Sequence, residues 1–261
     1  MAYRPFDLTG KVGLVTGGNG GIGLGFADAM AQAGADIAIW GTNEGKNEKA
    51  VAQLKGHGVK ARAWKVDVAD EAAVVKAMKE TAEAMGRIDS VFANAGIGKG
   101  ETSVMDITAE SWRKVLSVNL DGFFWTCREA SRHMVDRWKA GDRAGGRIVG
   151  VSSLGAIHGQ PRTEHYAASK GAVITIIQSL AVELARYRVT ANSVLPGWIA
   201  TEMTQHAQGN EKFTERVIGR VPMRRWGTPE DFGGIAVYLA SDASGYHSAD
   251  TFLIDGAYSR F

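Results

Sequence analysis

Short apolar runs alternate with longer amphipathic stretches along most of the chain. The runs contain four to six residues and are rich in Val and Ile, which is typical of strands, whereas the longer stretches repeat their apolar residues at helical spacing. The pattern predicts strands at residues 11–15, 36–40, 61–66, 90–93, 147–151, 189–194 and 251–254. It predicts helices at residues 22–33, 44–57, 71–85, 109–138, 166–185 and 229–240.

This alternation indicates an α/β fold. Strands joined by helical crossovers run parallel, and helices on both faces of a sheet require strands that are almost entirely apolar, as the run RIVGV illustrates. We therefore expect a doubly wound parallel sheet of seven strands in a single domain spanning residues 1–261. Residues 199–228 show no clear pattern, and we interpret this stretch as a lid rather than as a linker between domains.

Composition narrows the class of protein. The 261 residues are 45% hydrophobic and 22% charged, as in ordinary globular proteins, and the net charge of +2 supplies no broad basic surface for nucleic acid. The single cysteine, Cys127, can form neither an internal disulfide nor a multi-thiolate site, and we expect no metal. Neither a signal-peptide pattern nor an uninterrupted apolar run long enough to span a membrane is evident. We expect a cytoplasmic protein without nucleic-acid or membrane partners.

Glycine is abundant, with 33 residues, and one cluster is concentrated in a single loop. The sequence TGGNGGIG at Thr16–Gly23 joins the first predicted strand to the first helix, where backbone N–H groups and the helix dipole can hold a pyrophosphate. It matches both G-x-G-x-x-G and T-G-x-x-x-G-x-G, so the pattern leaves the register open. Its place in a strand–helix–strand unit favours a dinucleotide site over a flexible turn without a ligand.

The chain beyond the second predicted strand bears on how an adenosine would be held. An acid about 20 residues past such a loop commonly binds the ribose 2′-hydroxyl of NAD, and an arginine accommodates the 2′-phosphate of NADP. Glu44 has about this spacing, but Asn43 as the N-cap of the next helix, with Glu44 in its first turn, is a sufficient structural explanation. Lys46 either reaches a 2′-phosphate or is solvated. Asp67, at the end of the third strand, either meets the adenine amino group or caps the following helix.

Four polar residues are candidates for proton transfer. Tyr166 and Lys170 lie four residues apart on one helix face, and lowering the pKa of a tyrosine by about 3 units requires roughly 4 kcal/mol of phenolate stabilisation, much of which a close ammonium can supply. Ser153 ends the fifth strand, at the same edge of the sheet, where its hydroxyl can donate to a carbonyl. Asn119 lies inside a predicted helix, where asparagine is mildly unfavourable, which indicates a specific hydrogen-bonding role. Taken singly, the pair and the serine are also common as an exposed helical contact and a turn residue.

Together these motifs resemble the short-chain dehydrogenase/reductase family. The resemblance runs from Lys11 to about Gly256 and includes the sequences TGGNGGIG, DV, ANAG, VNLDG, VSS, YAASK and PGWIATEM. It implies a Rossmann-type sheet and the glycine register Gly17, Gly21 and Gly23. It also implies reversible hydride transfer between NAD(P)(H) and a ketone or secondary alcohol, with the catalytic set Asn119, Ser153, Tyr166 and Lys170.

The resemblance implies a role for each of these residues. Tyr166 would act as the general acid/base, and Ser153 would orient the carbonyl. Lys170 would bind the nicotinamide ribose and lower the pKa of Tyr166, while Asn119 would anchor a proton-relay water. Thr201 would hold the carboxamide. The expected cofactor-binding residues are Gly17, Asn19, Gly21, Ile22, Gly23, Thr42, Asn43, Asp67, Val68, Asn94, Ala95, Gly96, Tyr166, Lys170, Pro196, Gly197, Ile199 and Thr201.

Three positions bear on the choice of cofactor. In the resembling family, NAD users tend to carry an acid where this chain has Gly41, and NADP users an arginine where it has Thr42. The basic residue that many NADP users place before the second glycine is replaced by Gly20. Because no acid would repel a phosphate, we expect either NADP or NAD, with a slight preference for NADP.

The substrate would lie between the loop after Ser153 and the segment after Pro196. The candidate lining residues are Ser153, Leu154, His158, Tyr166, Trp198, His206 and Phe213. Their apolar and aromatic members favour a hydrophobic or mixed-polarity ketone over a phosphorylated sugar. A binding protein that senses the cofactor ratio and a non-redox lyase or epimerase are the alternative functions, and pairing of the two long apolar helices in the resembling family implies a homotetramer.

Overall fold

The computed structural model describes residues 4–98 and 100–260. Seven strands form one sheet in the order β3-β2-β1-β4-β5-β6-β7, and every pairing is parallel. The strands are β1 (Val12–Thr16), β2 (Asp36–Gly41), β3 (Ala61–Lys65), β4 (Ser90–Ala93), β5 (Gly146–Val151), β6 (Val189–Pro196) and β7 (Thr251–Ile254). The α/β class and the seven-stranded, doubly wound, Rossmann-type sheet predicted from the sequence are confirmed.

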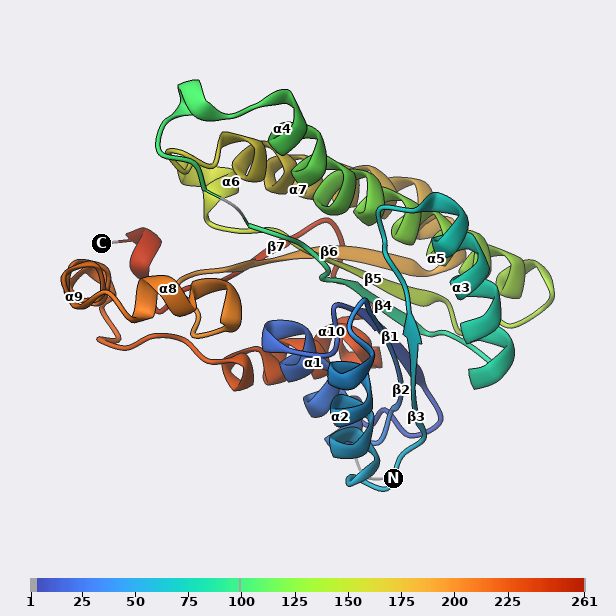
Figure 1. The fold of residues 1–261 in the computed structure, drawn as a ribbon. Helices are drawn as coiled ribbons and strands as arrows, with labels where there is room; N and C mark the ends of the chain where they lie inside the picture. The colour runs from blue at the N-terminus through green and yellow to red at the C-terminus, as the bar shows by residue number, and fades with distance from the viewer. Residues whose placement is uncertain (1–3, 99, 261) are drawn as a thin grey trace.

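Helices cover the sheet on both faces (Figure 1). One layer contains α3 (Glu71–Met85), α5 (Gly122–Lys139) and α7 (Glu164–Leu184), and the other contains α1 (Gly21–Gln32), α2 (Glu44–Lys55) and α10 (Gly233–Ala240). Two separate cores result, because successive residues of a strand point to opposite faces of the sheet. Leu14 belongs to the core under α3, α5 and α7, whereas its neighbour Val15 belongs to the core under α1, α2 and α10.

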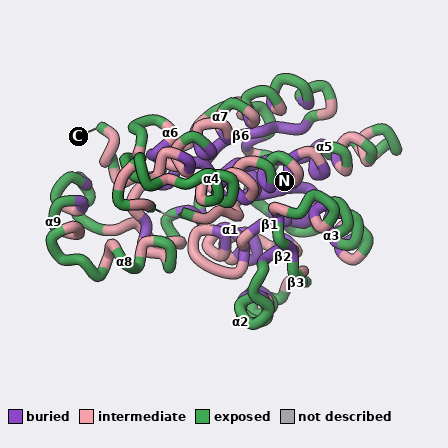
Figure 2. Tube along the Cα trace, turned by 45° about the horizontal axis from the view of Figure 1, so that its top comes forward, coloured by how far each residue is buried: buried purple, intermediate pink, exposed green. Residues whose placement is uncertain are grey.

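Buried residues run along the strands, as Figure 2 shows, while α2, α8 (Gln205–Gln208) and α9 (Glu211–Arg220) lie at the periphery and are mainly exposed. The remaining α-helices are α4 (Ala109–Leu116) and α6 (Gly155–His158). Short 3-10 turns occupy Val104–Asp106, Ala185–Tyr187, Glu202–Thr204, Pro229–Phe232, Asp242–Ser244 and Tyr258–Arg260.

The order of the strands reverses at β1. This strand pairs with β2 on one side and with β4 on the other, so the chain crosses from one half of the sheet to the other after β3. The loops that follow β1 and β4 therefore diverge, and in parallel sheets such a point leaves a crevice at the carboxyl edge of the strands. The glycine loop and the segment after Ala93 border this crevice.

Two predicted segments differ from the structure. The predicted helix at 109–138 is interrupted by a π-helical turn at Ser117–Asp121 between α4 and α5. The stretch 199–228, for which no element was expected, contains α8 and α9. Helix α9 begins where the Asn210 side chain accepts from the N–H of Phe213 (3.0 Å), and Val217 is its one buried residue, so its apolar pattern is weak.

Helix α7 and the turn after it, Glu164–Tyr187, are long and apolar enough by length and composition to cross a membrane. Val173, Ile177 and Leu184 on one side of this helix are buried in the core against the sheet. Helix α7 therefore belongs to one of the helical layers of the α/β fold. Its other apolar residues lie on the side that faces away from the sheet.

Candidate active site

The glycine loop between β1 and α1 requires glycine at four positions, one of which is Gly18, where a Cβ would lie 2.9 Å from the carbonyl oxygen of Val15. Gly17 and Gly21 have positive φ angles of 64° and 51°, which other residues rarely adopt. A Cβ on Gly23 would collide with the carbonyl group of Gly17 and the side chain of Asn94. By contrast, Gly20 is extended and has open space around it. The geometry therefore agrees with the register Gly17, Gly21 and Gly23.

Asn94 joins this loop to the end of β4. Its N–H donates to Oγ1 of Thr16 (3.0 Å) and its amide nitrogen donates to the carbonyl of Thr16 (3.0 Å). Thr16 Oγ1 also accepts from the N–H of Ala95 (3.0 Å). The Asn94 side chain thus holds the two diverging loops at a fixed separation, a role that the sequence did not reveal.

A cavity of about 620 Å³ follows the carboxyl edge of β1, β2 and β4. Its wall includes expected cofactor-binding residues from five segments, namely Gly17, Asn19, Gly21, Ile22, Thr42, Asp67, Val68, Asn94, Ala95, Gly96 and Thr201. Lys46 and Glu202 also line the cavity and form an ion pair that joins α2 to the segment after β6. The glycine cradle and the length of this cavity fit an extended dinucleotide.

The adenosine would lie beside Gly41 and Thr42, and the structure explains why position 41 is a glycine and not an acidic residue. Asn19 donates to Oδ1 of Asn47 (2.7 Å), and Asn47 donates to the carbonyl of Gly41 (3.0 Å). A Cβ on Gly41 would collide with both asparagine side chains. The space that an acidic side chain would need is therefore already filled.

The two acids near this end have structural partners or are exposed. Glu44 is exposed and pairs with Lys65 (3.0 Å), as its place in the first turn of α2 suggested. The alternative that Asp67 caps α3 is wrong, because Asp70 is the N-cap and accepts from the N–H of Ala73 (3.1 Å). Asp67 is exposed at the cavity wall.

Asn43 caps α2, as one reading of the sequence predicted. Its side-chain oxygen accepts from the N–H of Lys46 (3.0 Å). The cavity wall on this side is formed by Gly41, Thr42 and Lys46, and Asn43 lies outside it.

The π-helical turn positions Asn119 under the end of β4. Its Oδ1 accepts from the N–H of Ile97 (2.8 Å), and its Nδ2 donates to the carbonyl of Ile97 (2.9 Å) and to Oγ of Ser169 (3.3 Å). The side chain is 1% exposed, so these bonds satisfy a buried amide. The hydrogen-bonding role expected for Asn119 thus includes fixing the loop that follows β4.

Tyr166, Lys170 and Ser153 meet at the carboxyl edge of β5. Ser153 is the second residue after this strand, and it lines the same cavity as Tyr166 on α7. Lys170 Nζ lies 5.8 Å from the centre of the Tyr166 ring and donates to the carbonyl of Val151 (2.8 Å). Gly96 leaves room for the Lys170 side chain, since a Cβ at this position would lie 3.3 Å from Lys170 Nζ.

Burial shifts the pKa values of both groups on α7. The pKa of Tyr166 is raised by burial, and its hydrogen bond with Ser153 opposes this rise. The pKa of Lys170 is lowered to about 8 by burial. Burial therefore outweighs any effect of Lys170 on the tyrosine in this structure, and the implied lowering of the Tyr166 pKa stays a prediction.

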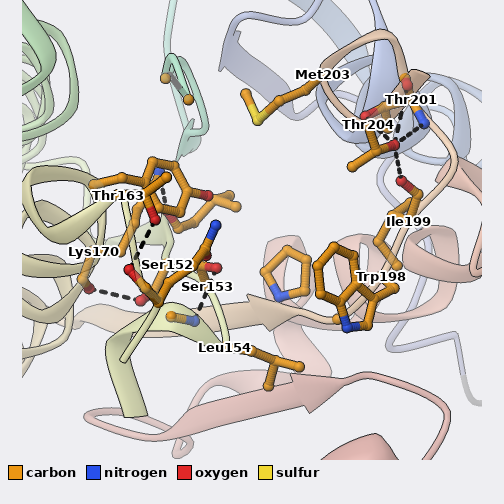
Figure 3. Close-up of a pocket in the computed structure, with 18 of the residues that line it drawn as sticks. Ser152, Ser153, Leu154, Thr163, Lys170, Trp198, Ile199, Thr201, Met203 and Thr204 are labelled. Carbon is orange, nitrogen blue, oxygen red and sulfur yellow. Dashed lines mark hydrogen bonds between the residues drawn. The ribbon is translucent and has the colours of Figure 1, made fainter. Parts of the chain in front are cut away.

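A second cavity, of about 390 Å³, opens beside these residues (Figure 3). Ser152, Ser153, Thr163 and Lys170 lie on one side of it, and Trp198, Ile199, Thr201 and Thr204 lie on the other. Leu154, His158 and Tyr166 also belong to its wall, as expected for substrate-binding residues. Pro196 and Gly197, which were expected to bind the cofactor, line this cavity too.

Two expected lining residues lie elsewhere. His206 is exposed on α8, where its neighbour Ala207 lines the cavity instead. Phe213 stacks edge-on against Trp198, with 5.3 Å between ring centres, and so supports the wall from behind.

Other lining residues were missed in the sequence, namely Gly98, Gly100, Gln160, Thr163, Met203 and Tyr258. The position of Gln160 and Thr163 between Ser153 and Tyr166 is a signal that could have found these two. Tyr258 reaches the cavity from the C-terminal segment, and no local pattern indicates this.

Known proteins match nearly the whole chain. A family model described as enoyl-(acyl carrier protein) reductase matches residues 17–259. An NADP-dependent (R)-specific alcohol dehydrogenase from Lentilactobacillus kefiri is 39% identical over 254 residues, 97% of this chain and 98% of the relative. A sorbose reductase from Schizosaccharomyces pombe is 36% identical over 256 residues, 97% of each chain.

Solved structures agree with these relatives. The crystal structure of a gluconate 5-dehydrogenase from Burkholderia cenocepacia in complex with NADP and tartrate superposes with a TM-score of 0.92 at 32% identity. The match covers 99% of this chain and 98% of that one. Sequence, fold and the arrangement of Ser153, Tyr166 and Lys170 thus lead to one assignment. The chain belongs to the short-chain dehydrogenase/reductase family.

Proposed function

We propose that this chain, an NAD(P)-dependent oxidoreductase of its family, interconverts a ketone and a secondary alcohol with Tyr166 as the general acid/base. The observation that carries the proposal is the meeting of Tyr166, Ser153 and Lys170 in the smaller cavity, which shares wall residues such as Asn94 and Thr201 with the dinucleotide cavity. The place where the two cavities share their wall is where a substrate carbonyl would lie against the nicotinamide ring.

Ser153 and Tyr166 have different roles in ketone reduction. When bound, the cofactor supplies the hydride that forms the new C–H bond at the carbonyl carbon. Ser153 donates a hydrogen bond to the carbonyl oxygen and orients it, while the Tyr166 hydroxyl donates its proton to that oxygen as the C=O π bond breaks. The ketone is thereby reduced to an alcohol, and the reverse direction requires Tyr166 to accept the proton. The raised pKa of Tyr166 keeps the hydroxyl protonated and suits the donor role.

The dinucleotide would be held along the sheet edge. Gly17 and Gly21 allow the backbone to approach the pyrophosphate, and the first turn of α1 presents its N–H groups. Lys170 would bind the nicotinamide ribose, and Thr201 the carboxamide. Lys46 lines the cavity beside Thr42, where a 2′-phosphate would lie, which supports the preference for NADP.

Further features of the whole chain are part of this proposal. Residues 1–261 form a single domain, and the segment around α8 and α9 acts as a lid over the smaller cavity. We also propose a cytoplasmic homotetramer, paired through the outer faces of the long helices. Relatives that act on alcohols, sorbose and gluconate support a small-molecule substrate.

A screen of ketones and alcohols with each cofactor tests the proposal. We expect reduced cofactor to be consumed with at least one ketone and formed with the matching alcohol. A cofactor-sensing protein would bind both cofactor forms without turnover. A lyase or epimerase would convert substrate with the cofactor tightly bound and no net change in its absorbance.

A further inference from the structure

The Gln160 side chain lies next to Ser153 in the smaller cavity. Its carbonyl accepts hydrogen bonds from the N–H (3.3 Å) and the hydroxyl (3.1 Å) of Thr163, which fixes its backbone ahead of α7. Its Oε1 lies 3.0 Å from the point that a Cβ on Gly155 would occupy, and Ser153 Oγ lies 3.6 Å from the same point. The Gln160 amide and the Ser153 hydroxyl therefore both lie against Gly155 in the wall of this cavity.

This amide is available to a ligand. Gln160 is half-buried in the cavity wall, and its side chain makes no hydrogen bond with any residue in the described part of the chain. A half-buried polar side chain without a protein partner normally forms its hydrogen bonds with water or with a ligand. An amide offers both a donor and an acceptor, which matches a neutral hydroxyl group.

The amide also has a defined place relative to the reaction. Tyr166 and Ser153 line the same cavity and would both contact the reacting oxygen. Gln160 extends this row of polar groups beyond Ser153. In an α-hydroxy ketone the two oxygens on adjacent carbons lie roughly one hydrogen-bond length apart, so the row can bind both at once.

Charge in the cavity argues against an anionic substrate. Among the described residues of the wall, Lys170 is the one lysine or arginine, and its Nζ donates to the carbonyl of Val151 (2.8 Å). Carboxylates and phosphates are usually bound by arginine or lysine side chains that face them directly. The cavity has a volume of about 390 Å³, and the nicotinamide ring would take part of it. The remaining space fits a small molecule.

We propose that Gln160 is a specificity-determining residue that binds a hydroxyl on the carbon next to the reacting carbonyl. The substrates are then small, neutral α-hydroxy ketones and the corresponding vicinal diols. This inference rests on the proposed function of Tyr166 and Ser153, and it adds the chemical class of the substrate.

The test compares 3-hydroxy-2-butanone with 2-butanone, which share a carbon skeleton and differ in one hydroxyl. With NADPH and with NADH, we expect kcat/KM for the hydroxy ketone to exceed that for 2-butanone about tenfold. Gln160→Leu should lower kcat/KM for the hydroxy ketone about five- to tenfold, mainly through KM, and change that for 2-butanone less than twofold. The size of the effect is that of one hydrogen bond in a partly solvated site.

Controls keep the outcomes distinct. Gln53→Leu makes the same change at an exposed position of α2 and should leave both substrates unaffected. If Gln160→Leu lowers thermal stability, Gln160→Asn withdraws the amide by one methylene and should give the same selective loss. An equal loss for both ketones in these variants would overturn the role of Gln160.

The inferred substrate class can be wrong even if the proposed function is right. Faster reduction of 2-butanone, or of the anionic ketone acetoacetate, than of the hydroxy ketone would overturn the inference while leaving Tyr166-dependent hydride transfer intact. Absence of turnover with every ketone and both cofactors would contradict both proposals.

Discussion

Tyr166 and Lys170 both lie where burial opposes ionisation. For the tyrosine this favours the neutral acid, and for the lysine it favours the neutral amine, with a pKa of about 8. A tyrosine and a lysine four residues apart could be found in the sequence, because helical spacing alone brings them to one face. The direction of the tyrosine shift could not be found, because it depends on burial by segments distant in the chain.

The pKa of Lys170 predicts how cofactor binding responds to pH. As the pH rises through about 8, the ammonium loses its proton, and the ribose hydroxyls lose a charged hydrogen-bond donor. The Kd for NADPH should therefore increase severalfold between about pH 7 and pH 9, as measured by fluorescence titration. Lys170→Met should bind more weakly and show a flatter profile. A constant Kd across this range in the parent protein would contradict the assignment of Lys170 to the ribose.

The place of Gln160 between Ser153 and Tyr166 can be read in the sequence, but the direction of its side chain cannot. Gln160 lies in a loop whose sequence gives no periodicity, and only the structure shows that its Oε1 lies against Gly155. Ser153 itself could be identified because the end of a parallel strand fixes its position at the sheet edge.

At the scale of the elements, the strands and long helices were predictable because their apolar positions repeat regularly. The π-helical turn at Ser117–Asp121 was not, since its residues continue the helical pattern. The partner of Asn119 in this turn, Ile97, lies far away in the sequence. Helices α8 and α9 were missed because they bury little apolar surface.

The ion pair between Lys46 and Glu202 links α2 to the lid and bears on cofactor choice. Both side chains are largely exposed, so the pair is worth at most about 1 kcal/mol. Glu202→Gln frees Lys46 and removes an anion from the cavity wall, and it should lower the Kd for NADP two- to fivefold while leaving that for NAD within twofold. Lys46→Ala should remove most of the preference for NADP.

Equilibrium titration of both cofactors checks this prediction. Glu44→Gln is the matched control, because Glu44 pairs with Lys65 instead of Lys46. An equal change for NADP and NAD in Glu202→Gln would exclude a role for Lys46 at the 2′-phosphate. A preference of the parent for NAD above about tenfold would contradict the inferred preference for NADP.

At the scale of the whole molecule, the parallel sheet could be predicted, but its strand order could not. Local patterns place strands and helices along the chain without stating that β4 pairs with β1, which creates the crevice for the dinucleotide. The resemblance to a known family implied a Rossmann-type sheet, and the structure shows the order of its strands.

The assembly is a prediction at the same scale. Trp112 and Phe124 are about 40% exposed and Val182 is 80% exposed, on the outer sides of α4, α5 and α7. Pairing of these helices across a two-fold axis would cover such residues, so we expect four copies of the 27.9 kDa chain in sedimentation analysis. Phe124→Glu should produce dimers or monomers. A glutamate introduced at an exposed position of α2, in Ala52→Glu, should leave the tetramer intact. A monomeric parent protein would contradict this assembly.

The most direct test of the central claim is the turnover of Tyr166→Phe. This change removes the hydroxyl that donates the proton and keeps the ring that packs beside Lys170. With the best ketone found, turnover should fall at least about 100-fold, while circular dichroism, the thermal midpoint and the Kd for the preferred cofactor stay close to those of the parent. Turnover within a few-fold of the parent would show that another group transfers the proton and that the proposed role of Tyr166 is wrong.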